Sequence, residues 1–163
     1  MKRILLGLTI ALAIVSCKKK TTTQTPDGPE QWIVGYWEMT DLEVSGSVDV
    51  GGNAVPLTGD GSNFVGGYQL NSDKTASYDF SCDLEIVIPV MGTFPIPFAQ
   101  KGSGTWALKN SNKLLVVTNT TSGQVSEFPI KVITENIMIL EQDSTFNMGG
   151  VSGTLNYEVT LEK

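Results

Sequence analysis

Fourteen consecutive residues of this chain alternate between apolar and polar side chains, and this pattern constrains the fold more than any other. From residue 75 to residue 88, the odd positions are polar up to Glu85, and the even positions carry Ala76, Tyr78, Phe80, Cys82, Leu84, Ile86 and Ile88. A period of two is the period of a β-strand, so the even face is predicted to be buried and the odd face to contact water. Cys82 is therefore predicted to be a small core residue rather than a nucleophile.

The rest of the stretch from residue 31 to residue 163 contains shorter strand candidates separated by turn-rich pieces. They cover 35–45, 64–70, 102–108, 113–118, 124–133, 137–142 and 152–161. In the first, Trp37 and Met39 share one parity and Leu42 and Val44 the other, which predicts a bulge near residues 40–41. No window keeps a helical period beyond a short stretch. The pattern predicts an all-β fold, an antiparallel meander closed as a barrel, with a β-sandwich as the alternative.

The N-terminus has the pattern of an export signal. Lys2 and Arg3 precede an apolar run, which at roughly 12 residues is shorter than the about 20 that a spanning helix needs. The run ends in Ile14-Val15-Ser16-Cys17, which resembles the bacterial lipobox. The resemblance implies cleavage before Cys17 and acylation of this cysteine with chains such as palmitate. A conventional signal peptide cleaved elsewhere is the alternative.

These features predict a signal peptide at 1–16, a flexible tether at 17–30 and one domain at 31–163. Lys18 is the second residue of the tether, directly after Cys17, and no acidic stretch follows it. By resemblance to bacterial lipoproteins, this favours anchoring in the outer membrane, facing the periplasm, with the N-terminal lipid as the membrane contact.

The composition excludes several kinds of function. The chain contains no histidine, and residues 31–163 carry 15 acidic side chains against six lysines. Histidine-dependent catalytic triads and imidazole metal sites are therefore excluded, and a nucleic-acid partner is disfavoured. Asp79, Asp83 and Glu85 are spread along one strand face, and residues 58–63 lack the spacing of a calcium loop, so both are interpreted as solvated. We expect no catalysis, no metal and no cofactor.

Three short motifs carry a family resemblance. The segment 32–38, with Gly35 and Trp37, resembles the Gly-x-Trp start of a lipocalin-like domain, while 68–78 and 104–108 are similar to patterns in small lipocalin-like lipoproteins of Bacteroidetes. The resemblance implies a lipocalin-like β-barrel whose floor is plugged by Trp37 and whose interior binds a small hydrophobic ligand. Lipocalins cover this tryptophan with an arginine, and the only arginine here is Arg3.

The candidate ligand-binding residues are the aromatic side chains predicted to face the barrel interior. They are Trp37, Tyr68, Tyr78, Phe80 and Trp106. An eight-stranded barrel is wide enough either to fill itself with side chains or to hold one small ligand, and the sequence leaves both open.

The segment 86–98 is almost wholly apolar and contains three prolines. Met91, Phe94, Ile96 and Phe98 in this hairpin are candidates for a lid or for a surface that docks an envelope protein partner. The alternative is that these side chains complete the core. Glycan binding by exposed aromatic side chains, Trp32 or Tyr36, is a further hypothesis.

Overall fold

The computed structural model describes residues 28–163 except 90 and 149–150. The signal peptide, Cys17 and tether residues 17–27 therefore lie outside the described residues. The elements are α1 (Pro29–Trp32), β1 (Gly35–Val50), β2 (Asn53–Leu70), β3 (Thr75–Ile88), β4 (Gly92–Lys109), β5 (Leu114–Asn119), β6 (Val125–Ile133), β7 (Ile137–Met148) and β8 (Val151–Glu162). The folded part begins at α1, slightly before the predicted start at residue 31.

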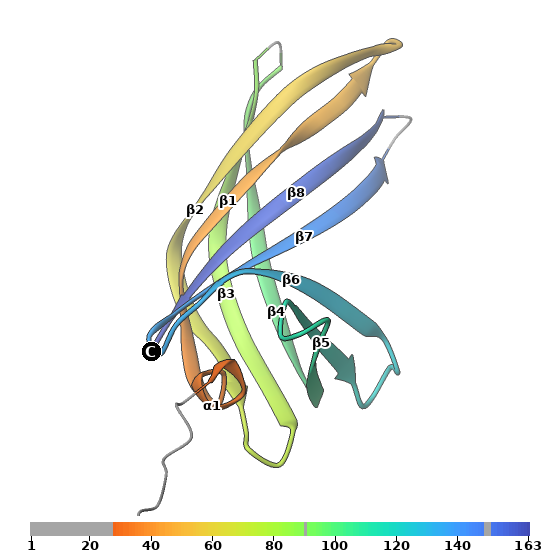
Figure 1. The fold of residues 1–163 in the computed structure, drawn as a ribbon. Coiled ribbons are helices and arrows are strands. Elements are labelled where there is room, and N and C mark those ends of the chain that lie inside the picture. Colours follow the sequence, from red (N-terminus) through yellow and green to blue (C-terminus); the bar gives the residue numbers. More distant parts are fainter. Residues whose placement is uncertain (1–27, 90, 149–150) are drawn as a thin grey trace, which may run out of the picture.

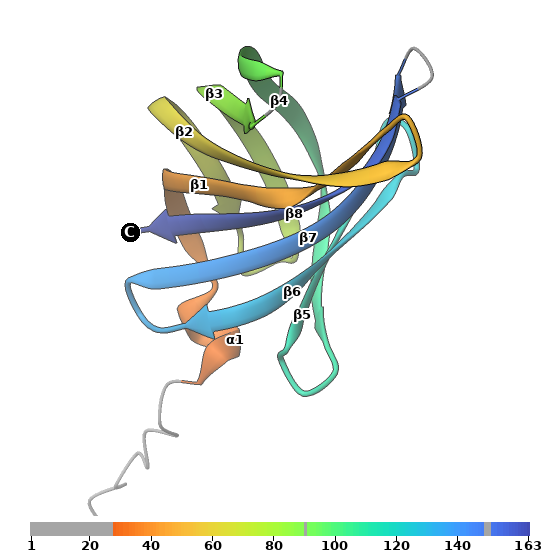
Figure 2. The same cartoon turned by 90° about the horizontal axis from the view of Figure 1, so that it is seen from above.

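The strands form one antiparallel meander in sequence order, and β1 closes the ring by pairing with β8 (Figures 1 and 2). The prediction of an all-β, closed antiparallel meander is confirmed. All eight strands belong to the same sheet, so the sandwich alternative does not apply to the described residues.

Strand bounds follow the side-chain pattern where that pattern is regular. The alternating segment forms β3 with the predicted bounds. The register of β1 against β8 shifts between Met39 and Asp41, which confirms the bulge. Residues 58–63 were predicted to be a solvated loop but lie within β2, where glycines and a second register shift between Ser62 and Val65 hide the strand pattern.

Helix α1 and the strand ends beside it close one end of the ring around Trp37, which has no exposed surface. The Trp37 indole Nε1 donates to the Ile33 carbonyl at 2.7 Å. The Lys163 ammonium lies 4.5 Å from the centre of the Trp37 ring and donates to the carbonyl oxygens of Val34, at 2.9 Å, and Trp32. Burial lowers the pKa of Lys163. A lysine thus supplies the cation above the floor tryptophan.

A second tryptophan fills the floor from β4. Trp106 is 2 % exposed, and its Nε1 donates to the Asn71 carbonyl at 3.0 Å, while Lys74 Nζ lies 3.9 Å from the ring centre. Close backbone packing completes this end of the ring. A Cβ atom added at Gly67 would collide with the Trp37 carbonyl oxygen, so only glycine lets β2 lie this close to β1.

Strand pairing goes all the way round the ring only in the half near α1. β4 pairs with β5 only from Gly104 to Lys109, and β7 pairs with β6 only from Met138 to Leu140. The other strands run well past the short β5 and β6 (Figure 1). Among the described residues, no ladder joins β4 residues 93–103 to β7 residues 141–145, and we call this gap the side window.

Candidate functional site

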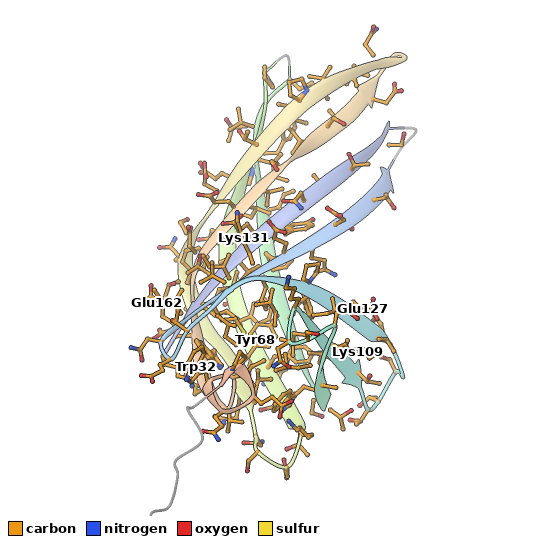
Figure 3. The ribbon with its side chains drawn as sticks, in the orientation of Figure 1. Trp32, Tyr68, Lys109, Glu127, Lys131 and Glu162 are labelled. Carbon is orange, nitrogen blue, oxygen red and sulfur yellow. The ribbon has the colours of Figure 1, made fainter. Side chains whose placement is uncertain are left out.

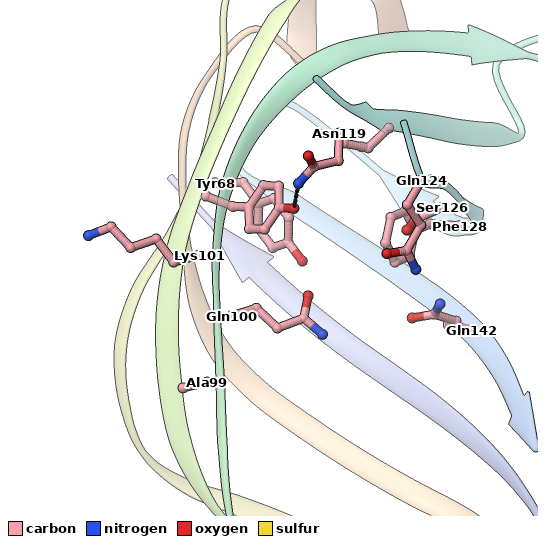
Figure 4. Close-up of a pocket in the computed structure, with 11 residues that line it drawn as sticks. Tyr68, Ala99, Gln100, Lys101, Asn119, Gln124, Ser126, Phe128 and Gln142 are labelled. Carbon is pink, nitrogen blue, oxygen red and sulfur yellow. Dashed lines mark hydrogen bonds between the residues drawn. The ribbon is translucent and has the colours of Figure 1, made fainter. Parts of the chain in front are cut away.

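A cavity of about 430 Å³ lies inside the ring at the side window (Figure 4). We call it the window cavity. Its lining residues are Tyr68, Tyr78, Ala99, Gln100, Lys101, Val117, Asn119, Gln124, Ser126, Phe128 and Gln142. A second cavity of about 190 Å³, the aromatic cavity, shares Tyr68, Gln100, Phe128 and Gln142 with it. The interior therefore contains open space as well as a packed floor. Side chains are crowded around the labelled Trp32 and Tyr68, at the end of the ring near α1 (Figure 3).

Neutral polar side chains dominate the wall of the window cavity. Gln100 on β4 and Gln142 on β7 project into the space from its two sides (Figure 4). Asn119 Nδ2 donates to the Tyr78 hydroxyl at 3.0 Å, and Asn119 Oδ1 accepts from the backbone N–H groups of Thr121 and Ser122. Because both ends of the Asn119 amide are bonded, its orientation is fixed.

Aromatic rings line the space between β2, β3, β4 and β8. The Tyr68 ring centre lies 5.8 Å from that of Tyr78 and 5.1 Å from that of Phe80. Phe98 continues the row at 6.0 Å from Phe80 and 6.4 Å from Tyr157. These separations are typical of favourable aromatic contacts, so the rings form one continuous apolar wall.

Tyr68 borders both cavities and carries a hydroxyl without a protein partner. The side chain is 9 % exposed, and no described residue forms a hydrogen bond with its hydroxyl. Burial raises the pKa of Tyr68, with a smaller contribution from Tyr78. At neutral pH this position is therefore an uncharged hydroxyl that can both donate and accept.

The interior is free of charge within the described part of the chain. Lys101 is the one charged residue that lines either cavity, and its ammonium is bonded to Asp79 Oδ2 at 2.5 Å. Both side chains of this pair are largely exposed. The described residues hold no cluster of three or more His, Cys, Asp or Glu side chains that would bind a metal, and none of their helices is long and apolar enough to cross a membrane.

The structure places the five predicted ligand-binding residues in two separate regions. Tyr68 and Tyr78 line the window cavity, and Phe80 lines the aromatic cavity. Trp37 and Trp106 line neither, because both are packed into the floor. Their predicted role in ligand contact is thus corrected to a structural one.

The apolar hairpin is likewise divided between two environments. Phe98 lines the aromatic cavity, as the core interpretation expects. Phe94 and Ile96 pair with Ile86 and Leu84 of β3, so they lie on the inner face of the sheet, yet they are 39 % and 41 % exposed. These two residues, together with the exposed Met91, keep the lid or docking interpretation open.

Four amide residues of the site, Gln100, Asn119, Gln124 and Gln142, were not predicted from the sequence to line it. Gln100, Asn119 and Gln142 each occupy a strand position on the same parity as buried neighbours, for example Met138 and Leu140 before Gln142. The sequence signal that could have identified these residues is a polar side chain at a strand position whose neighbours of the same parity are buried. The glycan candidate Tyr36 lies instead on the outer surface, where it borders a shallow groove.

No known protein family, no curated protein and no solved structure matches this chain.

Proposed function

We propose that this chain is a lipid-anchored binding protein that holds a small ligand inside a lipocalin-like barrel. The observation that carries the proposal is the window cavity beside the aromatic cavity, two neighbouring spaces that share four lining residues above a packed floor. The window cavity, at about 430 Å³, falls within the roughly 300–1,000 Å³ usual for small-molecule sites. Among the described residues, the one charged side chain that lines the site, Lys101, is paired with Asp79, and no carboxylates cluster there, which favours binding over catalysis.

The floor supports the lipocalin-like part of the proposal. The resemblance around Gly35 and Trp37 implies a tryptophan plug with a cation over it, and Lys163 occupies that place in a chain whose one arginine is Arg3. The side window is a departure from a ring paired along its whole height, and it supplies a lateral way into the interior.

A neutral naphthylamine dye, N-phenyl-1-naphthylamine, tests interior binding. We expect its fluorescence to rise with the wild-type chain and to fall back with Ser126→Phe, because the added ring fills the window cavity. The double variant Phe94→Ser/Ile96→Ser is the matched control, because it removes dye adsorption at the exposed hairpin without changing the window cavity. If Ser126→Phe leaves the signal unchanged while the hairpin variant removes it, the interior site is refuted.

We further propose that Cys17 anchors the protein in the outer membrane with the domain in the periplasm. The lipobox supports the lipid, and Lys18 and the missing acidic stretch support the location. Cys17→Ser should abolish incorporation of labelled palmitate and release the chain from the membrane fraction. Retention of this variant in that fraction would contradict the anchor.

Docking of an envelope protein on the hairpin is a second candidate, favoured by the exposed Met91, Phe94 and Ile96. A photo-cross-linking amino acid at position 94 should then give one discrete cross-linked species in cells, and the same label at Tyr36 should not. Equal patterns from the two positions would argue against docking.

A further inference from the structure

We infer that the ligand of the inner site is an uncharged amphiphile whose polar head is bound by the Tyr68 hydroxyl and whose apolar part lies along Phe80 and Phe98. This inference rests on the proposed binding function and specifies the chemistry of the same site. It differs from the purely apolar ligand that the family resemblance implies.

The two neighbouring cavities differ in chemistry, and this difference predicts an amphiphile. The side of the window cavity near Gln100, Asn119 and Gln142 offers amide donors and acceptors. The aromatic cavity shares Gln100 and Gln142 and adds Ser144, but the rest of its lining is mostly apolar and includes Phe80, Phe98, Met39, Leu42 and Val159. A purely apolar ligand would leave the Gln100 and Gln142 amides and the Tyr68 hydroxyl without a ligand partner, which costs binding free energy.

The Tyr68 hydroxyl identifies where the polar head binds. Tyr68 borders both cavities, is about nine-tenths buried, and has no hydrogen-bond partner among the described residues. The Tyr68 hydroxyl is not among the fully enclosed unpartnered atoms of the described residues, so it is open to the cavity and can bond a molecule that enters there. A ligand hydroxyl or ether oxygen at this junction would satisfy the Tyr68 hydroxyl while the rest of the ligand contacts the aromatic row.

The charges around the site disfavour an anionic head such as a fatty-acid carboxylate. Among the described residues, Lys101 is the one cation that lines either cavity, and its ammonium is paired with Asp79, with both side chains largely exposed. The domain carries 15 acidic side chains against six lysines, so its field repels anions. A buried carboxylate without a cationic partner would be strongly unfavourable.

The free edge of β4 also argues against a peptide strand in the window. The Ser103 carbonyl accepts from the Thr120 N–H, so backbone groups of odd-numbered β4 residues point toward β5 and the window. Pro95 and Pro97 lie on this parity and have no N–H to donate. The edge is therefore interrupted for strand addition, while a small ligand needs no continuous ladder.

Two calorimetric titrations of the protein test the inference, one with octyl glucoside below its critical micelle concentration and one with octanoate. The two probes share an eight-carbon chain and differ in the charge of the head. We expect octyl glucoside to bind at least about tenfold more tightly, because octanoate must bury an unpaired charge. Methyl glucoside, which has the head alone, should bind more weakly than octyl glucoside.

Tyr68→Phe should weaken octyl glucoside binding by about 2- to 12-fold, the range for one hydrogen bond. The same change at the exposed Tyr36 should leave affinity unchanged. Because the Tyr68 hydroxyl has no protein partner, Tyr68→Phe should not lower the urea midpoint, which separates a binding role from a structural one.

Equal or tighter binding of octanoate, or an unchanged affinity in Tyr68→Phe, would overturn the inference and leave the binding function standing. If neither probe binds and the naphthylamine dye also fails to respond to Ser126→Phe, both proposals fail.

Discussion

Replacing the floor tryptophan by phenylalanine, Trp37→Phe, should lower the free energy of unfolding by about 2–4 kcal/mol. The indole Nε1 bond to the Ile33 carbonyl is buried, and an unpaired buried carbonyl costs about 1–3 kcal/mol. Weaker attraction of the Lys163 ammonium to the smaller ring adds about 0.5–1 kcal/mol. The void left by the smaller ring supplies the rest.

Trp32→Phe is the matched control, because the Trp32 Nε1 is buried without a hydrogen-bond partner among the described residues. Trp32→Phe breaks no such hydrogen bond, so it should lower the free energy of unfolding clearly less than Trp37→Phe does. Urea unfolding at neutral pH, followed by far-UV circular dichroism and by fluorescence of the remaining tryptophans, measures both variants.

If Trp37→Phe lowers the free energy of unfolding no more than Trp32→Phe, the stabilising role of the floor hydrogen bond is refuted. Trp37→Phe also tests whether the floor contributes to stability without contributing to ligand binding. Trp37 lines neither cavity, so Trp37→Phe should bind octyl glucoside with wild-type affinity under conditions where it is folded.

Three other outcomes follow from the structure. Pro95→Thr/Pro97→Thr restores N–H donors to the free edge of β4 and should increase self-association in light scattering after size-exclusion chromatography; a size distribution identical to wild type would contradict the protective role of the prolines. Because burial raises the pKa of Tyr68 above the ordinary value of about 10, the unfolded state loses a proton at alkaline pH that the folded state retains. The free energy of unfolding of the wild type, measured relative to that of Tyr68→Phe, should therefore be constant below about pH 10 and should fall by about 1.4 kcal/mol by about pH 11 in urea titrations. A difference between the two chains that does not change with pH would refute this. Burial also raises the pKa of the Cys82 thiol, so in a Cys17→Ser chain this thiol should react with an aromatic disulfide reagent only after urea unfolding, and rapid labelling of the folded chain would contradict its place in the core.

The sequence predicted the strands best where one face is buried and the other solvated. In β3 every even position packs inward, so alternation gave its bounds directly. β2 and β4 extend well beyond their predicted parts. Glycines and a bulge interrupt the pattern in β2, while β4 near residues 93–98 has Phe94, Ile96 and Phe98 on one face and prolines instead of polar residues on the other.

The site was predictable only in its aromatic part. Tyr68, Tyr78 and Phe80 followed from strand parity, but the cavity depends on where β5 and β6 end and on β6 leaving β7 below the window. Those are tertiary features that periodicity does not encode. The inward amides were overlooked because a glutamine on a strand normally faces water.

A crystal structure of the chain with octyl glucoside tests the central claim, a ligand site inside the ring, most directly. We predict the glucosyl group within hydrogen-bond distance of the Tyr68 hydroxyl, between Gln100 and Gln142, with the octyl chain along Phe80 and Phe98. An empty interior, with the probe found only in the outer groove beside Tyr36, would contradict it.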